Sequence, residues 1–401
     1  MIMKKKIRTL IKSMTIMLYR CMVKILPVKK DIILFESNLG RNYTGNPRAI
    51  YEEIVRQGLD KQYECVWFFE NPRKKIKGNA KIVKRARLQY LYYMAVAKVW
   101  VFDCRQPEFL IKRKETSYIQ TWHGTPLKKL ALDMEQIDSV VSSSIDEYHE
   151  QFRKNTATWD YLISQNHFST ETFRRCFDFE GKPIFEVGYP RNDVLFKHNN
   201  ERDINRLKEK YNIPKDKKVI LYAPTWRDNE FYVQGVYKFV SPLDFKKAQK
   251  ELGDEYVFLV KYHYLVSDKI DWSEYEGFVY SFNEKVDISR LYLIADMMIT
   301  DYSSVMFDYS LLKRPMFFFA YDLENYENNL RGFYFDFLKE APGPISKTTD
   351  QLISDIKSYD EKEWEEKYSQ FSQKYNSADD GKASAKIVEK IKGFIGEKKV
   401  R

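Results

Sequence analysis

The segment 287–322 constrains the fold of this chain more than any other. Its residues, DISRLYLIADMMITDYSSVMFDYSLLKRPMFFFAYD, predict a helix, a buried strand, a sharp polar turn, a second helix and a second buried strand. Short apolar strands that alternate with helices are typical of parallel α/β sheets. We therefore expect the C-terminal half of the chain to contain an α/β domain.

The polar turn in this segment, residues 300–304, predicts an anion-binding site. Asp301 is placed to cap the helix that follows, and the amides and hydroxyls of Ser303 and Ser304 would then face a ligand at the helix N-terminus. A phosphate-bearing ligand fits such a site. An ordinary capped helix in a core is the alternative interpretation.

The length of 401 residues predicts two domains. Strand-like runs lie at 31–36, 63–69, 99–104, 118–121, 161–165, 219–223, 256–262 and 278–282, with helix-like stretches between them. A charged segment at 198–218, which contains Pro214, interrupts this pattern. We expect a basic segment at 1–30, an N-terminal domain at 31–205, a C-terminal domain at 206–375, and a terminal helix with a basic tail at 376–401.

The net charge of +10 is concentrated at the N-terminus, because the first 30 residues hold nine Lys or Arg and no acid. This distribution argues against a nucleic-acid-binding surface. The same segment carries an apolar stripe at helical spacing, formed by Ile7, Leu10, Ile11, Met14, Met17, Leu18, Cys21 and Ile25. The pattern predicts an amphipathic helix on an anionic membrane surface. A helix packed on the protein body and a secretory signal are the alternatives, and the second lacks a cleavage site.

Several common functional classes have no support in the sequence. The four cysteines are far apart without CxxC spacing, which favours a reducing compartment and argues against structural zinc. There is no GxSxG, no Gly-rich Lys loop, no GxGxxG and no HExxH. No stretch approaches the ~20 apolar residues of a membrane-spanning helix. Asp296 and Asp301 are candidate ligands of a divalent cation, although the first fits a helix-to-strand turn and the second fits a cap.

Two of the five histidines directly follow strand-like runs, one in each half of the chain. His123 follows Ser117-Tyr-Ile-Gln-Thr-Trp, and His263 follows Val257-Phe-Leu-Val-Lys-Tyr. A histidine at the carboxyl end of a strand is exposed to an active-site cleft, and its pKa near neutrality suits general acid or base catalysis. Satisfied structural histidines are the alternative.

Six segments together resemble a known family. They are His123-Gly-Thr-Pro-Leu-Lys128, Gly188-Tyr-Pro-Arg-Asn-Asp193, Tyr222-Ala-Pro-Thr-Trp-Arg-Asp228, Lys261-Tyr-His263, the stretch 287–304, and Arg331-Gly332. In this order they resemble the CDP-glycerol:poly(glycerophosphate) glycerophosphotransferases, the teichoic acid primases and polymerases of Gram-positive bacteria. The resemblance covers roughly 31–332. This chain has Tyr264 where the family usually has proline after the second histidine.

The resemblance implies a GT-B-like architecture, in which two Rossmann-like domains face a central cleft. It implies that the C-terminal domain binds the CDP-linked donor and that the N-terminal domain receives a lipid-linked acceptor. The implied site residues are His123 and His263 as catalytic groups; Ser303, Ser304, Asp301, Arg227, Arg331 and Thr225 on the donor side; and Gly124, Thr125, Asn192 and Asp193 as acceptor-side or structural residues.

The implied reaction transfers glycerol phosphate from CDP-glycerol to an undecaprenyl-diphosphate-linked disaccharide or glycerophosphate acceptor and releases CMP. The absence of large extensions favours a primase or short-chain extender at the cytoplasmic face of the membrane. No cofactor is certain, and a divalent cation stays open. CDP-ribitol as donor, a GT-B glycosyltransferase that uses a nucleotide sugar, and a membrane-associated scaffold are the competing hypotheses.

Overall fold

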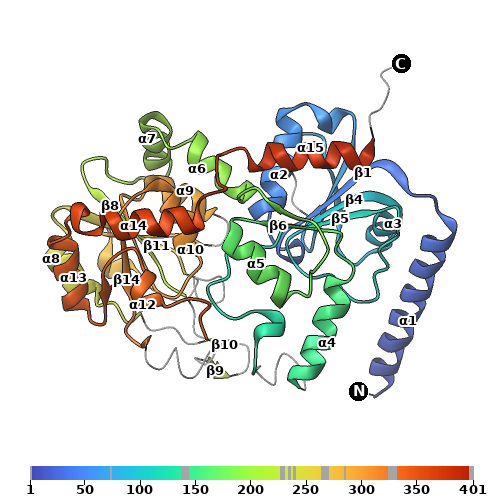
Figure 1. Ribbon diagram of the computed structural model, residues 1–401, viewed down its shortest axis with the longest axis horizontal. Helices are drawn as coiled ribbons and strands as arrows, with labels where there is room; N and C mark the ends of the chain where they lie inside the picture. The colour runs from blue at the N-terminus through green and yellow to red at the C-terminus, as the bar shows by residue number, and fades with distance from the viewer. Residues whose placement is uncertain are drawn as a thin grey trace.

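Two parallel β-sheets organise the chain, one in each half of the sequence (Figure 1). The computed structural model describes residues 2–72, 75–136, 144–225, 231–233, 236–237, 241–262, 271–283, 286–323 and 332–396. The predicted α/β class with two parallel sheets is confirmed.

The first sheet has seven strands in the order β3-β2-β1-β4-β5-β6-β7, and every neighbouring pair is parallel. Successive residues of its central strand point to opposite faces: Ile33 and Phe35 belong to one buried cluster, whereas Ile32 and Leu34 belong to another. The strands are β1 (Lys29–Glu36), β2 (Glu64–Phe69), β3 (Lys81–Lys84), β4 (Ala97–Phe102), β5 (Ser117–Gln120), β6 (Tyr161–Ser164) and β7 (Ile184–Glu186).

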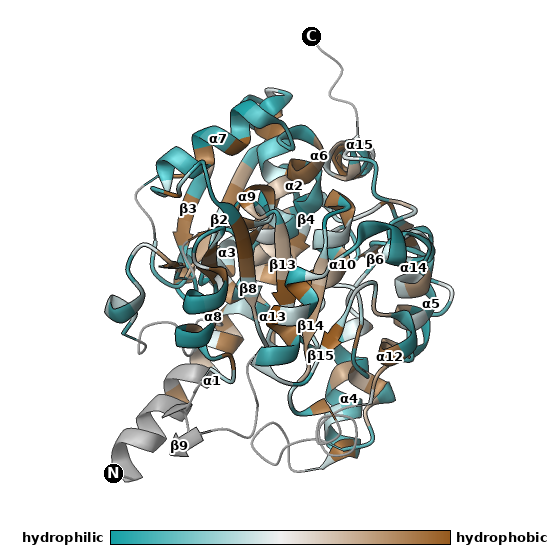
Figure 2. Cartoon of the chain, turned by 90° about the vertical axis from the view of Figure 1, so that its left-hand side faces the viewer, coloured by the Kyte–Doolittle hydropathy of each residue, from teal (hydrophilic) through white to brown (hydrophobic). Residues whose placement is uncertain are grey.

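The second sheet has six strands in the order β12-β11-β8-β13-β14-β15, again all parallel. Its strands are β8 (Lys218–Ala223), β11 (Tyr256–Val260), β12 (Val279–Ser281), β13 (Met297–Thr300), β14 (Met316–Phe319) and β15 (Ile345–Ser346). A separate antiparallel hairpin joins β9 (Phe231–Val233) and β10 (Val236–Tyr237). Parallel strands that are covered on both faces need continuous apolar runs, and Figure 2 shows these strands in brown beneath largely teal outer helices.

Helices cover both faces of each sheet. One face of the first sheet packs on α1 (Ile2–Ile25), α3 (Leu88–Val96), α4 (Ile145–Thr156) and α5 (His167–Cys176), and the other on α2 (Gly45–Arg56) and α15 (Ala383–Ile395). One face of the second sheet packs on α6 (Asp193–Lys197), α7 (Glu201–Lys210), α9 (Ile288–Ile294), α10 (Val305–Tyr309), α12 (Phe337–Glu340) and α14 (Glu361–Tyr375), and the other on α8 (Phe245–Leu252) and α13 (Thr349–Lys357).

The C-terminal helix α15 returns to the first sheet after the chain has completed the second (Figure 1). Ile387, Val388 and Ile391 are fully buried in the same cluster as Ile50 of α2. The carboxylate of Asp193 accepts hydrogen bonds from the first two amides of this helix, at 3.0 and 2.9 Å. The end of the chain therefore ties the two halves together.

Helix α1 stands at the edge of the first half (Figure 1), and one face of its described part packs on it. The docked face is centred on Tyr19, whose hydroxyl donates to the Ile111 carbonyl at 2.9 Å, and Met22 and Val23 pack beside it. Met14 and Met17, which belong to the predicted apolar stripe, are 58% and 64% exposed. None of the helices in the described part of the chain has the length and apolar character that crossing a bilayer requires.

Candidate active site

His123 lies just beyond the carboxyl end of β5, at the edge where the loops of the parallel sheet gather. Trp122 has a φ of +49°, so the backbone turns sharply before the histidine. The two rings stack, with their centroids 4.4 Å apart. The His123 side chain stays accessible to solvent. These features allow it to meet a substrate.

The backbone of Asp103, which follows β4, fixes the orientation of the His123 ring. Nδ1 of His123 lies 3.0 Å from the Asp103 carbonyl oxygen. A carbonyl can only accept, so Nδ1 carries the hydrogen and Nε2 of the neutral ring keeps its lone pair. The Asp103 carboxylate is held in turn by the Ser37 hydroxyl at 2.7 Å and the Asn38 amide at 2.8 Å.

The protonation of this pair follows from its surroundings. Desolvation lowers the pKa of His123, although the Asp103 carboxylate acts in the opposite direction. Burial raises the pKa of Asp103, whereas the Ser37 hydrogen bond and His123 oppose that rise. A neutral imidazole with a free Nε2 is the form that a general base requires.

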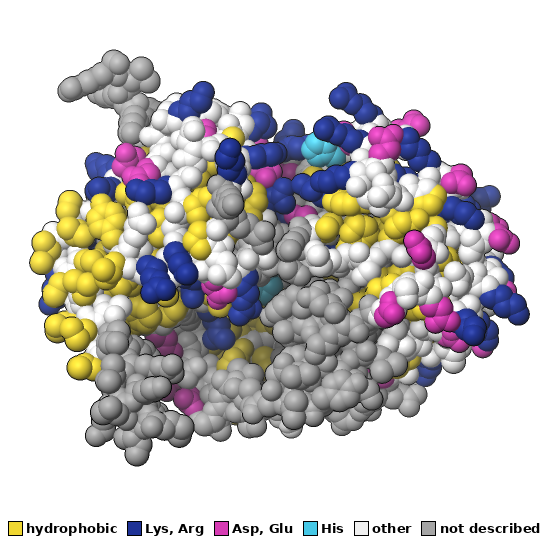
Figure 3. Space-filling model, turned by 180° about the vertical axis from the view of Figure 1, so that it is seen from behind, with side chains coloured by type: hydrophobic (Ala, Val, Ile, Leu, Met, Phe, Trp, Pro, Cys, Tyr) yellow, Lys and Arg dark blue, Asp and Glu magenta, His cyan; other side chains and the backbone are white. Residues whose placement is uncertain are grey.

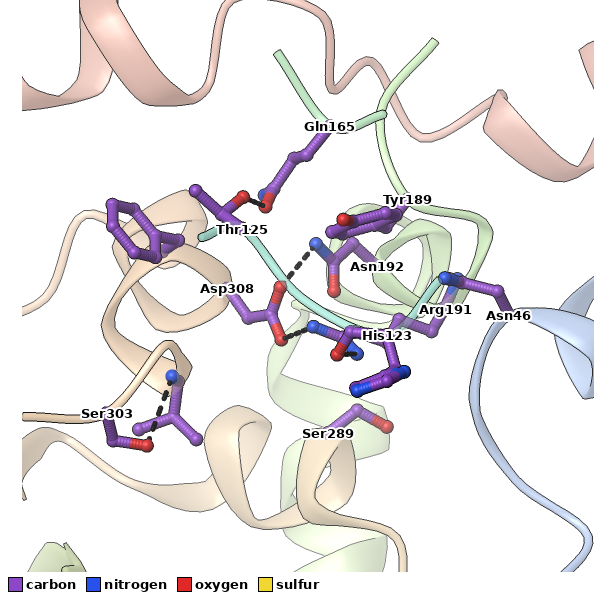
Figure 4. A network of polar contacts seen from close by, with 12 residues as sticks. Asn46, His123, Thr125, Gln165, Tyr189, Arg191, Asn192, Ser289, Ser303 and Asp308 are labelled. Atoms are coloured by element: carbon purple, nitrogen blue, oxygen red, sulfur yellow. Dashed lines mark hydrogen bonds and ion pairs between the residues drawn. The ribbon is translucent and has the colours of Figure 1, made fainter. Parts of the chain in front are cut away.

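Arg191 connects His123 to the second half of the chain (Figure 4). Its Nη1 donates to the His123 carbonyl at 2.6 Å, and its Nη2 contacts Oδ2 of Asp308 on α10 at 2.6 Å. Asn192 donates to the other oxygen of Asp308 at 2.9 Å. The predicted residue Asn192 therefore helps to hold the two halves together. Arg191 and Asp308 were not predicted as site residues, although Arg191 lies inside the Gly188–Asp193 motif.

Asn46 at the start of α2 supports the same backbone from the other side. Its side-chain amide donates to the carbonyls of Thr121 and Trp122 at 3.2 and 3.1 Å, and its oxygen accepts from the Arg191 amide at 3.1 Å. Asn46 is buried. The strand end that carries His123 is thus held rigidly by polar contacts.

The turn after β13 meets the turn after β5. A methyl group at Gly124 would come within 3.0 Å of the Ser304 hydroxyl, so the two turns are in close contact. The structure therefore brings the predicted anion-binding turn next to His123, although the two are about 180 positions apart along the chain.

The prediction that Asp301 caps the following helix is wrong. Ser304 is the residue before α10, and its side chain makes no capping bond. The Asp301 carboxylate instead accepts from the Thr225 amide at 2.8 Å and from the Thr225 hydroxyl at 2.9 Å. Asp301 and Thr225 therefore tie together the loops that follow β13 and β8, two adjacent strands.

Ser303 and Ser304 lie at the start of α10, as expected. The Ser303 hydroxyl accepts from the Val305 amide at 3.5 Å, a long contact that a ligand can replace (Figure 4). Both side chains are partly exposed. This leaves them available to an anion in front of the turn.

The remaining predicted residues fall into two groups. The Thr125 hydroxyl donates to Gln165 at 2.5 Å in the buried interior, and Asp193 caps α15, so these two residues have structural roles. The three residues His263, Arg227 and Arg331 lie outside the described residues.

Two smaller expectations concern a divalent cation and the other histidines. Asp296 accepts from the Val219 amide at 2.8 Å, which matches its expected place at a helix-to-strand turn. Within the described ranges, no three His, Cys, Asp or Glu side chains form a cluster that could hold a metal ion.

His149 contacts the Met134 carbonyl and His198 contacts Asp203, both away from His123.

These features define a class of protein: an α/β transferase in which loops at the carboxyl ends of two parallel sheets meet around a candidate base and a candidate anion-binding turn. The model of the CDP-Glycerol:Poly(glycerophosphate) glycerophosphotransferase family matches residues 18–393, and the chain belongs to this family.

Two curated relatives are polymerases. The chain is 43% identical over 396 residues to teichoic acid poly(glycerol phosphate) polymerase from Bacillus spizizenii, which covers 98% of this chain and 100% of that sequence. It is 45% identical over 374 residues to the protein of the same name from Bacillus subtilis, which covers 92% of this chain and 50% of that sequence. The chain thus spans about half the length of the second relative.

A solved structure confirms the fold. The wall teichoic acid polymerase TagF is 43% identical and superposes with a TM-score of 0.91 over 98% of this chain and 95% of that one. A histidine-to-asparagine variant of TagF soaked with CDPG is 41% identical, with a TM-score of 0.90 and coverage of 98% of this chain and 97% of that one.

Proposed function

We propose that this protein transfers glycerol phosphate from CDP-glycerol to a lipid-linked wall teichoic acid acceptor and releases CMP. Membership of the family and the names of the relatives support the reaction class. The CDPG soak of the TagF variant supports CDP-glycerol as the donor. The two facing parallel-sheet domains fit the GT-B-like architecture that this reaction class led us to expect.

One observation carries the mechanism: His123, with Nε2 free, lies beside the turn that contains Ser303 and Ser304. The Asp103 carbonyl fixes the orientation of the His123 ring. Gly124, the next residue, is in close contact with Ser304 of the turn. A general base must lie within hydrogen-bond reach of the acceptor hydroxyl, close to the phosphorus that this hydroxyl attacks. This arrangement provides such a base at the boundary of the two domains.

In the proposed step, Nε2 of His123 takes the proton of the acceptor hydroxyl while its oxygen attacks the β-phosphorus of CDP-glycerol. A new P–O bond forms, the bond between the β-phosphorus and the bridging oxygen breaks, and CMP leaves with that oxygen. Catalysis of phosphoryl transfer depends chiefly on positioning and on stabilisation of charge.

Negative charge gathers on the leaving group and on the equatorial phosphate oxygens. We assign its stabilisation to the hydroxyls of Ser303 and Ser304, with His263, Arg227 and Arg331 as further donors. Asp301 takes no proton in this scheme. Its two hydrogen bonds to Thr225 keep the adjacent loops in register.

The exposed surface of helix α1 is consistent with an acceptor that is anchored in a membrane. At 100° per residue, its exposed apolar residues lie on the side opposite to the docked face around Tyr19. The hydrophobic side chains over α1 form a patch at the left edge of Figure 3. Arg20 and Lys24 flank this patch and are exposed. This patch supports a peripheral position on the membrane, which we propose to be its cytoplasmic face, with the patch in the lipid interface.

A donor screen tests the proposed reaction. Purified protein is incubated with a disaccharide-lipid acceptor analogue and CDP-glycerol, CDP-ribitol or UDP-sugars, and CMP or UDP release and product mass are measured. We expect CMP release and addition of glycerol phosphate with CDP-glycerol alone. Turnover of CDP-ribitol or a UDP-sugar in its place would reassign the donor, and no turnover with any donor would refute transfer.

A further inference from the structure

A polar cavity of about 510 Å³ lies between the two halves of the molecule. The N-terminal half contributes the loop 42–44, two residues of α2 and the segment 75–77. The C-terminal half contributes Asp287 and Arg290 at the start of α9. Binding sites for small molecules commonly measure about 300–1,000 Å³. The cavity can therefore accommodate a small polar ligand.

The charges that line this cavity favour an anion. The basic residues are Arg48, Lys75, Lys77 and Arg290, and the acidic residues are Glu52 and Asp287. This is an excess of two positive charges. Both carboxylates are already engaged by Arg48, which lies 2.8 Å from Glu52 and 3.0 Å from Asp287. The second of these ion pairs joins the two halves across the cavity.

Two of the cations are free to bind a ligand. Within the described ranges, neither Lys75 nor Arg290 has a side-chain hydrogen bond or an ion pair, whereas Lys77 lies 3.9 Å from Glu52. Lys75 belongs to the N-terminal wall and Arg290 to the C-terminal wall. An arginine fork and a lysine on opposite walls match the tetrahedral oxygens of a phosphate group.

Sequence neighbours of the cavity-lining residues lie close to His123. Asn46 and Ser289 are sequence neighbours of the cavity-lining residues Thr44 and Arg290. Figure 4 shows Ser289 next to the His123 ring and Asn46 at the side away from Ser303. The Thr44 hydroxyl also reaches Asp287 at 3.5 Å. The segments that line the cavity therefore continue toward the His123 ring.

We propose that this cavity is the acceptor subsite and that Lys75 and Arg290 bind the phosphodiester next to the acceptor's terminal hydroxyl. This inference rests on the function proposed above. In-line displacement places the attacking hydroxyl opposite the leaving CMP, with His123 beside that hydroxyl, so the acceptor phosphate belongs on the side of the reacting phosphorus that is away from the nucleotide. No bond is made or broken in the cavity, which only positions the hydroxyl.

Steady-state kinetics with Lys75→Ala and Arg290→Ala test the assignment. We expect each change to raise KM for a glycerol-phosphate-terminated acceptor by about 10-fold, the loss of one charge-assisted hydrogen bond. KM for CDP-glycerol and kcat at saturating acceptor should stay unchanged. The matched controls are Lys61→Ala and Arg202→Ala, which remove exposed cations away from the cavity. They should leave all three parameters unaltered.

A binding measurement separates the cavity from the reaction. Glycerophosphoglycerol, which is a single phosphodiester, is titrated into the wild-type protein by calorimetry and tested as an inhibitor. We expect it to compete with the acceptor but not with CDP-glycerol, and to bind more weakly to both cavity variants. If KM for CDP-glycerol rises instead, the cavity belongs to the donor and the assignment is wrong. Unchanged acceptor KM in an active enzyme also overturns it, whereas failure of the proposed function appears as wild-type protein that releases no CMP.

Discussion

Nη2 of Arg191 lies 2.6 Å from Oδ2 of Asp308, and this ion pair spans the boundary between the two sheets. Asp308 is almost completely buried, with 5% of its side chain exposed, and Arg191 also donates to the carbonyl of His123. The position of the candidate base is therefore coupled to the helix that follows the anion-binding turn. Domain association and active-site geometry depend on the same side chain.

Loss of this pair should affect both stability and activity. Removal of one partner of a buried ion pair leaves an uncompensated charge, and we expect Asp308→Ala to lower the free energy of unfolding by about 3 kcal/mol in urea titrations. Arg191→Ala should in addition reduce kcat, because the His123 backbone loses a hydrogen bond. Lys215→Ala, which breaks an exposed pair with Glu209, should change stability by less than about 1 kcal/mol. Equal effects of the buried and exposed changes would contradict this account.

The pH dependence of kcat/KM should report the neutral form of His123. The pKa of His123 is lowered, so activity should rise with pH through a midpoint below the usual value of about 6.5 and then stay flat. Asp103 raises this pKa, so Asp103→Asn should move the midpoint to lower pH.

His123→Ala should reduce kcat by roughly 10²–10⁴-fold without unfolding. His167→Ala is the matched control, because His167 is an exposed histidine, and full activity of His123→Ala would exclude the base.

Gly124→Ala should impair catalysis more than folding. The added methyl group meets the Ser304 hydroxyl at 3.0 Å, so the two turns must separate by a few tenths of an ångström. We expect a higher KM for CDP-glycerol and a melting temperature close to wild type. Gly393→Ala provides the comparison, since nothing lies within 4 Å of the new methyl group and the residue is inside α15. It should stabilise the protein by about 0.5–1 kcal/mol and leave kinetics alone.

Asp301→Ala should disturb the loops that face the donor. The variant removes the buried carboxylate that accepts from the Thr225 amide. Loss of the partner of such a group typically lowers the free energy of unfolding by about 1–3 kcal/mol. Asp301→Asn keeps one acceptor and should cost less. Chemical denaturation of both variants measures the difference. A wild-type transition for Asp301→Ala would show that the tie between β8 and β13 is dispensable.

Membrane association should depend on the exposed stripe of α1. Met14→Glu combined with Met17→Glu places two anions in the patch, so we expect the protein to dissociate from vesicles that contain anionic lipid. Activity on long-chain lipid acceptors should fall more than activity on soluble analogues. Ser369→Glu with Gln370→Glu adds the same charge on exposed positions of α14 and should leave sedimentation with vesicles unchanged. Retained vesicle binding by the α1 variant would refute the orientation.

The pattern of apolar runs was sufficient to predict most strands of both sheets, because strands that are buried on both faces must be continuously apolar. It did not reveal β3, β7 and β15, which are edge strands of four, three and two residues. Too few residues are buried there to stand out from a loop. For α1, one face docks on the first half, and the stripe residues Leu10, Met14, Met17, Leu18 and Ile25 are exposed, so membrane association stays a prediction.

The sequence by itself determined the α/β class, the candidate base at His123 and the candidate anion site at Ser303 and Ser304, because local periodicity and turn chemistry are written in neighbouring residues. Only the tertiary structure decided how these parts are joined. Asp301 binds Thr225 rather than capping its own helix, and Arg191 reaches Asp308 across the domain boundary. Such contacts depend on which loops the parallel sheets bring to a shared edge, and no local pattern encodes that meeting.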